Sequence, residues 1–149
     1  MNQIDVEKVV KNLIDTFIDA GKISIELRIQ GLKKEIKSDN TPVSNGDIEV
    51  NTIITKKIKE LTPNIPIVSE ETSENKSVSD LKDFWLIDPI DGTYDYINDL
   101  DEFTINAGLI IQKKPAAGLI YAPAKNRMFY SYGDDLSFEL ISGKPNKLD

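Results

Sequence analysis

The order of two hydrophobic periodicities along the chain most constrains its fold. Apolar side chains first recur every three or four positions, over residues 6–18 and again over residues 48–61, which predicts two helices. Ser44 is a good N-cap for the second helix, and Pro63 ends it. Short alternating runs with turn residues between them then predict antiparallel strands at 103–112, 115–122, 126–132 and 136–141. Helices followed by a strand meander are typical of an α+β fold.

Shorter apolar patterns complete the expected order. Residues 65–68 predict a buried strand, and residues 84–87 predict another that ends at Asp88-Pro89, because proline cannot continue a central ladder. A short helix is predicted around residues 92–97, directly after this strand.

Three segments without a helical period are assigned from local chemistry. Ile23, Ile25, Leu27 and Ile29 alternate after Gly21, so the pattern alone predicts a strand over residues 22–30. Residues 37–43 and 72–80 are rich in polar and turn-forming side chains, which predicts loops.

Composition excludes several kinds of chemistry. The 149 residues suit one domain, and they include no His and no Cys, so thiolate nucleophiles, catalytic triads with histidine and zinc sites of the usual kind are excluded. Any metal ion must be held by oxygen, which leaves Mg²⁺, Mn²⁺ or Ca²⁺. A net charge of −7 gives no basic stripe for a nucleic acid polymer. No signal peptide or transmembrane segment is evident, so the expected location is the cytoplasm.

The segment Trp85–Thr93 carries the strongest chemical signal. An apolar strand delivers Asp88, and Asp91 follows three residues later, so both carboxylates can reach the same side of a turn. Such close carboxylates repel each other unless a cation lies between them or one is protonated. Gly92 and Thr93 offer backbone N–H groups at a helix start, where phosphate binds readily, and the Thr93 hydroxyl can orient a water. The alternative is an ordinary turn in which Asp91 caps the helix.

Further acidic residues strengthen the metal interpretation. Glu70-Glu71 follows a short strand, as Asp88 does, and Asp47 lies in the first turn of the second helix. The alternatives are solvated loop charges for the glutamates and complementation of the helix dipole for Asp47. Together, Asp47, Glu70, Asp88 and Asp91 would form a pocket that only cations make tolerable. Clustered hard cations, a phosphate-sized backbone nest and a water-orienting hydroxyl indicate metal-assisted hydrolysis of a phosphate ester.

These motifs resemble the inositol monophosphatase superfamily of Mg²⁺-dependent, lithium-sensitive phosphatases. The matching blocks are Glu70-Glu71 and Trp85–Thr93, with Lys37–Asp47, Glu102–Asn106 and Gly118–Pro123 most similar to the CysQ-like 3'(2'),5'-bisphosphate nucleotidases. The resemblance implies a phosphoric monoester hydrolase that converts adenosine 3',5'-bisphosphate to AMP and phosphate, in sulfur metabolism. Inositol monophosphate is the alternative substrate, and a truncated, catalytically silent metal-binding half-domain is the alternative to an enzyme.

The resemblance also implies a role for each matched residue. Glu70 would bind the first metal ion, Asp88 would bridge two ions and Asp91 would bind the second. The Ile90 carbonyl would complete one metal shell, and the N–H groups of Gly92 and Thr93 would hold the phosphate. Asp47, Thr93 and Glu70 form the implied catalytic set: Thr93 and Asp47 would help to orient or deprotonate the attacking water. Asp47 would lie near a third, weaker ion, so that two or three Mg²⁺ ions are implied.

The same resemblance sets expectations for the fold and the partners. It implies a layered α/β/α arrangement whose N-terminal half packs long helices on a mainly antiparallel sheet, with residues 4–30 mostly one helix. Residues 1–149 would be the N-terminal metal- and phosphate-binding domain, and the C-terminal α/β domain of the family, with a further Asp ligand, would be absent. An exposed apolar face is then expected, covered by self-association or by a complementing C-terminal half. The expected location is the cytoplasm or the periphery of the inner membrane.

Overall fold

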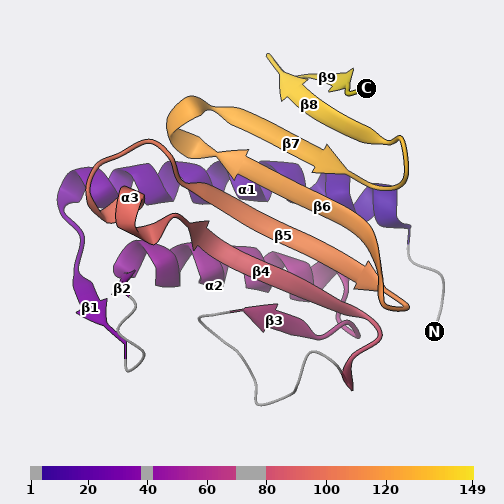
Figure 1. Cartoon of the computed structure of the whole chain (residues 1–149), viewed down its shortest axis with the longest axis horizontal. Coiled ribbons are helices and arrows are strands. Elements are labelled where there is room, and N and C mark those ends of the chain that lie inside the picture. Colours follow the sequence, from indigo (N-terminus) through magenta and orange to yellow (C-terminus); the bar gives the residue numbers. More distant parts are fainter. Residues whose placement is uncertain (1–4, 38–41, 70–79) are drawn as a thin grey trace.

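Two long helices pack side by side on one face of a seven-stranded sheet (Figure 1). The computed structural model describes residues 5–37, 42–69 and 80–149. Helix α1 spans Val6–Gln30 and α2 spans Asn45–Leu61. The strands of the sheet, in spatial and chain order, are β3 (Ile67–Ser69), β4 (Phe84–Asp91), β5 (Thr104–Ile111), β6 (Lys114–Ala122), β7 (Arg127–Ser131), β8 (Ser137–Ile141) and β9 (Lys144–Lys147).

The sheet is antiparallel except where β3 pairs in parallel with β4. A short helix α3 (Thr93–Ile97) follows β4, and a 3-10 turn (Pro123–Lys125) follows β6. The prediction of an α+β fold with long helices on a mainly antiparallel sheet is confirmed. None of the described helices combines the length and the apolar character that a membrane crossing requires.

Helix α1 continues to Gln30, so the strand predicted from the alternation over residues 22–30 is wrong and the helix implied by the resemblance is confirmed. In the C-terminal half of α1 the buried face is made by small residues, because Ala20, Gly21 and Ser24 are buried whereas Ile29 is 80% exposed. A methyl group at Gly21 would collide with the ring of Tyr121 on β6. Close approach of the helix to the sheet, rather than the alternating isoleucines, therefore decides the conformation.

Two strand pairings were not expected from the sequence. Strands β1 (Lys34–Ile36) and β2 (Pro42–Ser44) form an antiparallel hairpin, so the loop predicted over residues 37–43 is wrong at its C-terminal end. Residues 38–41 lie outside the described residues, as does most of the loop predicted at 72–80. Strand β9 pairs with β8 beyond the predicted meander.

Strand β4 does not end at Asp88-Pro89 as predicted but runs on to Asp91. Its register with β5 shifts between the pairs Asp88–Asn106 and Asp91–Thr104, which marks a bulge around Pro89. On its other side β4 pairs in parallel with the described residues of β3, from Trp85 to Ile87. Proline is tolerated at such a bulge because the ladder is already interrupted there.

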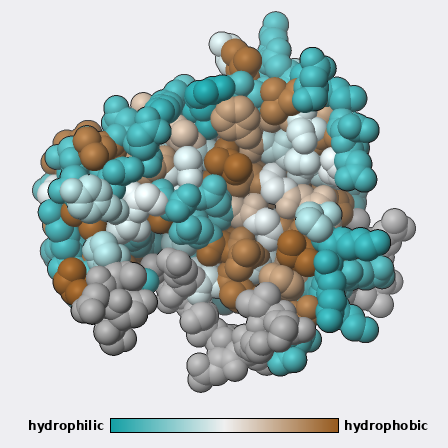
Figure 2. Space-filling model, viewed as in Figure 1, coloured by the Kyte–Doolittle hydropathy of each residue, from teal (hydrophilic) through white to brown (hydrophobic). Residues whose placement is uncertain are grey.

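The two faces of the sheet differ sharply. The side chains toward the helices form the core, where Trp85 is fully buried and its indole N–H donates to Thr62 Oγ1 at 3.0 Å. On the opposite face Leu86 and Ile120 are 51% and 47% exposed, and they border a shallow groove of about 490 Å³. Figure 2 shows hydrophobic residues gathered over this face. The predicted open apolar face is therefore present on the described part of the chain.

Candidate active site

Strand β4 and the turn after it carry most of the predicted site residues. The strand ends at Asp91, and Gly92 then adopts the left-handed conformation (φ 85°, ψ 43°) that starts α3. Only glycine fits comfortably here, because a Cβ would also lie 2.7 Å from the Glu102 carbonyl oxygen. In the described part of the chain no side chain caps the first turn of α3, because its N-cap is Gly92, so the leading N–H groups are available to another acceptor.

Asp47 is fixed at the start of α2 by a reciprocal cap with Ser44. The Ser44 hydroxyl and N–H donate to Asp47 Oδ2 at 2.6 and 2.9 Å, and the Asp47 N–H donates to Ser44 Oγ at 3.3 Å. Only 2% of Asp47 is exposed. Its position in the first turn also suits the positive end of the helix dipole, as the alternative interpretation held. These contacts occupy Oδ2 and leave Oδ1 for a further partner.

That partner is Thr93. Its hydroxyl lies 3.1 Å from Asp47 Oδ1 and 3.2 Å from the Ile90 carbonyl oxygen. One hydroxyl has a single proton, which it donates toward these two oxygens, so toward any other neighbour it acts as an acceptor. A water that donates to Thr93 Oγ1 would therefore be oriented with its own lone pairs pointing away. The structure thus brings together three predicted residues from α2, β4 and α3.

Asp88 and Asp91 lie at the edges of two different hollows. Asp88 is half-buried on the open sheet face, where it lines the groove with Asn106 and Phe129. Asp91 is exposed and lines a second cleft, of about 310 Å³, together with Gly92, Lys125 and Arg127. Within residues 5–37, 42–69 and 80–149, no three acidic side chains form a group that could hold a metal ion. Glu70 and Glu71 lie outside these ranges, so the four-carboxylate pocket stays a prediction.

The donor chemistry of the β4 end nevertheless suits a hard cation. The carboxylates of Asp88 and Asp91 and the carbonyl of Ile90 all belong to one short segment, and all are oxygen donors. The absence of His and Cys from the sequence leaves no softer ligand to compete. The ligand types that these residues offer are therefore those that Mg²⁺ prefers.

Sequence reasoning missed Asn51, one turn after Asp47 on the same helix face. It is 2% exposed and accepts a hydrogen bond from Ser69 Oγ at 2.6 Å, at the last residue of β3. Helix α2 therefore contacts Ser69 of β3 through Asn51 and Thr93 of α3 through Asp47. The available signal was a polar side chain four positions after Asp47, among the apolar residues of the buried face.

Tyr94 and Tyr96, which follow the Trp85–Thr93 segment, differ in role. Tyr94 is 70% exposed, whereas Tyr96 is fully buried and cannot line a substrate mouth. Burial, and then the nearby Asp47 carboxylate, raise the pKa of the Tyr96 hydroxyl. The hydroxyl therefore stays protonated and donates to the Ser24 carbonyl of α1 at 2.7 Å.

Replacing Gly92 by alanine tests the turn directly. The added methyl group meets the Glu102 carbonyl, and the positive φ is unfavourable for alanine, so the turn must shift. We expect destabilisation of about 1–3 kcal/mol in urea unfolding. Gly143→Ala is a matched control, because Gly143 has φ 77° but no atom near its Cβ position. Equal losses in the two variants would show that only the backbone angle matters.

Comparisons with known proteins show which family the chain matches. Residues 5–138 match a family model described as "Inositol monophosphatase family". The chain is 37% identical over 119 residues to a 3'(2'),5'-bisphosphate nucleotidase CysQ from Haemophilus influenzae, and 42% identical over 94 residues to CysQ from Escherichia coli K12. These matches cover 76% and 62% of this chain but 43% and 38% of the relatives.

A solved structure described as an IMPase/NADP phosphatase complexed with Mg²⁺ and phosphate has the same fold. Its TM-score is 0.78 at 18% identity, over 90% of this chain and 51% of that one. The chain therefore spans less than half the length of the two curated relatives and about half of the solved structure.

Proposed function

Because the chain belongs to the inositol monophosphatase family, we propose that it forms the metal- and phosphate-binding domain of a Mg²⁺-dependent phosphate monoester hydrolase. The observation that carries the proposal is the hydrogen bond from Thr93 Oγ1 to Asp47 Oδ1, which joins residues 46 positions apart in the chain. A purely structural cap on α2 needs only Ser44, so the bond to Thr93 supports a chemical role for Asp47.

In this proposal Thr93 and Asp47 act on the attacking water. The water donates to Thr93 Oγ1, whose own proton is directed to Asp47, and the proton released during attack passes along this pair to the carboxylate. The Ser44 contacts hold Asp47 in place during this transfer. Burial of Asp47 keeps competing water away from the receiving oxygen.

Asp88, Asp91 and the Ile90 carbonyl would hold Mg²⁺, and Glu70 would complete the set. Two or three ions and sensitivity to lithium follow from the family resemblance. When bound, Mg²⁺ polarises the phosphoryl group and neutralises its charge. The uncapped N–H groups at Gly92 and Thr93 would bind the phosphate oxygens.

The substrate proposed is adenosine 3',5'-bisphosphate, converted to AMP and phosphate in the cytoplasm as part of sulfur metabolism. The identity to nucleotidases named CysQ supports it over inositol monophosphate, which remains the second candidate. We further propose that residues 1–149 are the N-terminal domain and that the remaining half of such enzymes covers the open sheet face. The share of the relatives that the chain spans and the apolar groove on that face support this arrangement.

The test is an assay of the purified chain with each substrate, in Mg²⁺ and in EDTA. We expect phosphate release from adenosine 3',5'-bisphosphate at least tenfold faster than from inositol 1-phosphate, a difference of about 1.4 kcal/mol in barrier, and only with Mg²⁺. The reverse preference would favour an inositol monophosphatase. Binding of Mg²⁺ without turnover of either substrate would favour the silent half-domain.

A further inference from the structure

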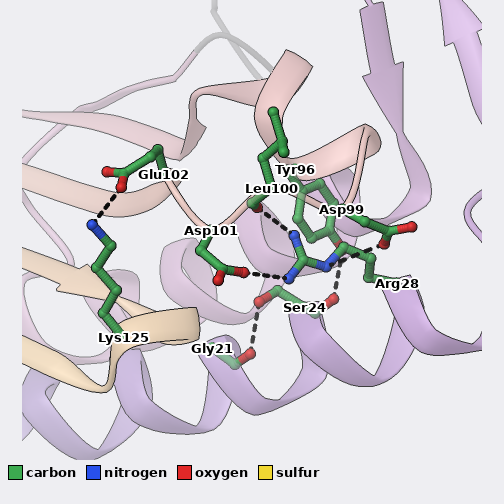
Figure 3. Close-up of polar contacts among 9 residues, drawn as sticks. All are labelled: Gly21, Ser24, Arg28, Tyr96, Asp99, Leu100, Asp101, Glu102 and Lys125. Carbon is green, nitrogen blue, oxygen red and sulfur yellow. Dashed lines mark hydrogen bonds and ion pairs between the residues drawn. The ribbon is translucent and has the colours of Figure 1, made fainter.

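Arg28, in the last turn of α1, reaches across to the loop that follows α3. Its guanidinium donates from Nη1 to the Leu100 carbonyl at 2.7 Å. It also lies 3.7 Å from Asp99 and 3.5 Å from Asp101, and the Arg28 side chain is only 11% exposed (Figure 3). A largely buried arginine with a carbonyl as its closest partner holds a loop in place more firmly than a surface ion pair does.

The same guanidinium packs on two aromatic rings. It lies 5.0 Å from the ring centre of Phe103 and 5.7 Å from that of Tyr96, and the two rings are 4.9 Å apart. The Tyr96 hydroxyl returns to α1 by its bond to the Ser24 carbonyl, one turn before Arg28 (Figure 3). Helix α1, helix α3 and the loop between Asp99 and Phe103 therefore form one packed unit.

This unit packs against the proposed phosphate-binding turn at Gly92–Thr93. The space beside Gly92 is filled by the Glu102 carbonyl, at 2.7 Å from a built Cβ, and by Phe103. The Tyr96 ring likewise fills the space beside Gly46, the residue before Asp47. A movement of the loop would therefore displace the backbone at Gly92, and a movement of the Tyr96 ring would displace Gly46, next to Asp47.

We propose that Arg28 is a positioning residue, which fixes the Gly92–Thr93 turn and its bond to Asp47 by holding the Leu100 carbonyl and the two rings. The inference rests on the proposed function, because it assigns the turn to phosphate binding. Asp99 and Asp101 contribute little, since their side chains are 83% and 64% exposed. A lysine cannot replace Arg28 fully, because it lacks the planar fork and stacks less well.

The first arm of the test needs no ligand. The Tyr96 amide donates to the Gly92 carbonyl at 2.9 Å, so its hydrogen exchange in EDTA reports on the turn. We expect Arg28→Met to speed this exchange about tenfold, relative to amides of strand β5, with Arg28→Lys intermediate. Asp99→Asn and Asp101→Asn should change it less than twofold. Unchanged Tyr96 exchange in Arg28→Met would overturn the inference whatever the chain catalyses.

The second arm measures binding of inorganic phosphate in Mg²⁺ by calorimetry on the same full chain. We expect the dissociation constant to rise about tenfold in Arg28→Met, with partial recovery in Arg28→Lys, since displacement of a binding group by a remote change can reach this size. Thr62→Val is the matched control, because it breaks the buried bond to Trp85 at the other end of α2. It should lower stability but leave phosphate affinity unchanged.

Two outcomes separate the inference from the function on which it rests. An equal loss of phosphate affinity in Thr62→Val and Arg28→Met would show that Arg28 acts only through global stability, and would overturn the inference alone. Failure of the unaltered chain to bind phosphate in Mg²⁺ would overturn the proposed function, and with it the role of Arg28 in that function.

Discussion

Replacing Asp47 by asparagine is expected to slow phosphate ester hydrolysis by about 10²–10⁴-fold, the usual contribution of a general base. Asparagine keeps the shape of the side chain and can still cap α2, so the helix should form. It cannot accept the proton that Thr93 passes on, because the amide oxygen is far less basic than a carboxylate. The measurement is the initial rate with adenosine 3',5'-bisphosphate in Mg²⁺, together with urea unfolding of the same preparation.

Asp5→Asn is the matched control for this change. Asp5 caps α1 as Asp47 helps to cap α2, and its carboxylate accepts from the Lys8 N–H at 3.1 Å. The substitution is chemically the same, but Asp5 lies at the exposed start of the chain's first helix. We expect its rate to stay within twofold of the unaltered chain. An Asp47→Asn variant that keeps more than a tenth of the original rate would contradict the proton-accepting role.

The hydrogen bond between Thr93 and Asp47 also predicts how the rates of the single and double variants compare. If Thr93 and Asp47 act as one relay, Thr93→Val combined with Asp47→Asn should be little slower than the slower single variant. If the two residues acted independently, the rate losses of the two single variants would instead multiply in the double variant. Thr93→Ser should retain most of the rate, because it keeps the hydroxyl that lies 3.1 Å from Asp47.

Local chemistry was sufficient to predict the elements that depend on neighbouring residues. Ser44 caps α2 as expected, α2 ends before Pro63, and the antiparallel meander has the predicted order. The capping contacts lie within a few residues along the chain, and each strand of the meander pairs with the strand that follows it in the sequence. Periodicity and capping therefore predicted both the class of fold and most element boundaries.

The parts that were predicted wrongly depend on distant contacts. The continuation of α1 is decided by the fit of Gly21 against Tyr121, 100 positions away, which no local pattern of isoleucines reports. The continuation of β4 past Pro89 depends on its pairing with β5, where the register shifts between Asp88 and Asp91. Hydrophobic alternation describes one segment at a time and carries no information about such partners.

The site was accessible from the sequence only through its motifs. The segment from Asp88 to Thr93 indicates a metal- and phosphate-binding site because two carboxylates, a glycine and a hydroxyl occur together in it. A shared role for Thr93 and Asp47 was implied only by the family resemblance, since spacing alone cannot bring those residues together, and the structure adds the hydrogen bond between them. Arg28 was missed altogether, because a helix-end arginine gives no sign of a partner 72 positions later.

Replacing Asp88 by asparagine is expected to abolish the stabilisation that Mg²⁺ gives the folded chain. A ligand at 100 times its dissociation constant stabilises a protein by about 2.7 kcal/mol. For a domain of this size that corresponds to a rise in melting temperature of about 5–10 °C. If Asp88 bridges two ions, as the family resemblance implies, its loss should remove nearly all of this stabilisation, whereas Glu70→Gln should remove less, because one ion could remain. The measurement is thermal unfolding of each variant in Mg²⁺ and in EDTA.

The control for Asp88 must separate coordination from screening, because the chain carries a net charge of −7 and any divalent cation will relieve some of its self-repulsion. Glu139→Gln provides that control: Glu139 lies on β8, three strands beyond β5, and pairs with Arg127 at 3.0 Å. The Arg127 guanidinium donates to the Glu139 carboxylate and lowers its pKa, so Glu139 is charged at neutral pH. Glu139→Gln and Asp88→Asn each replace one carboxyl group by an amide, so they change the formal net charge of the chain equally. Screening predicts equal reductions of the Mg²⁺ effect in the two variants, and coordination predicts a loss in Asp88→Asn alone. An unaltered chain that melts at the same temperature with and without Mg²⁺ would show that the β4 carboxylates hold no ion in this chain.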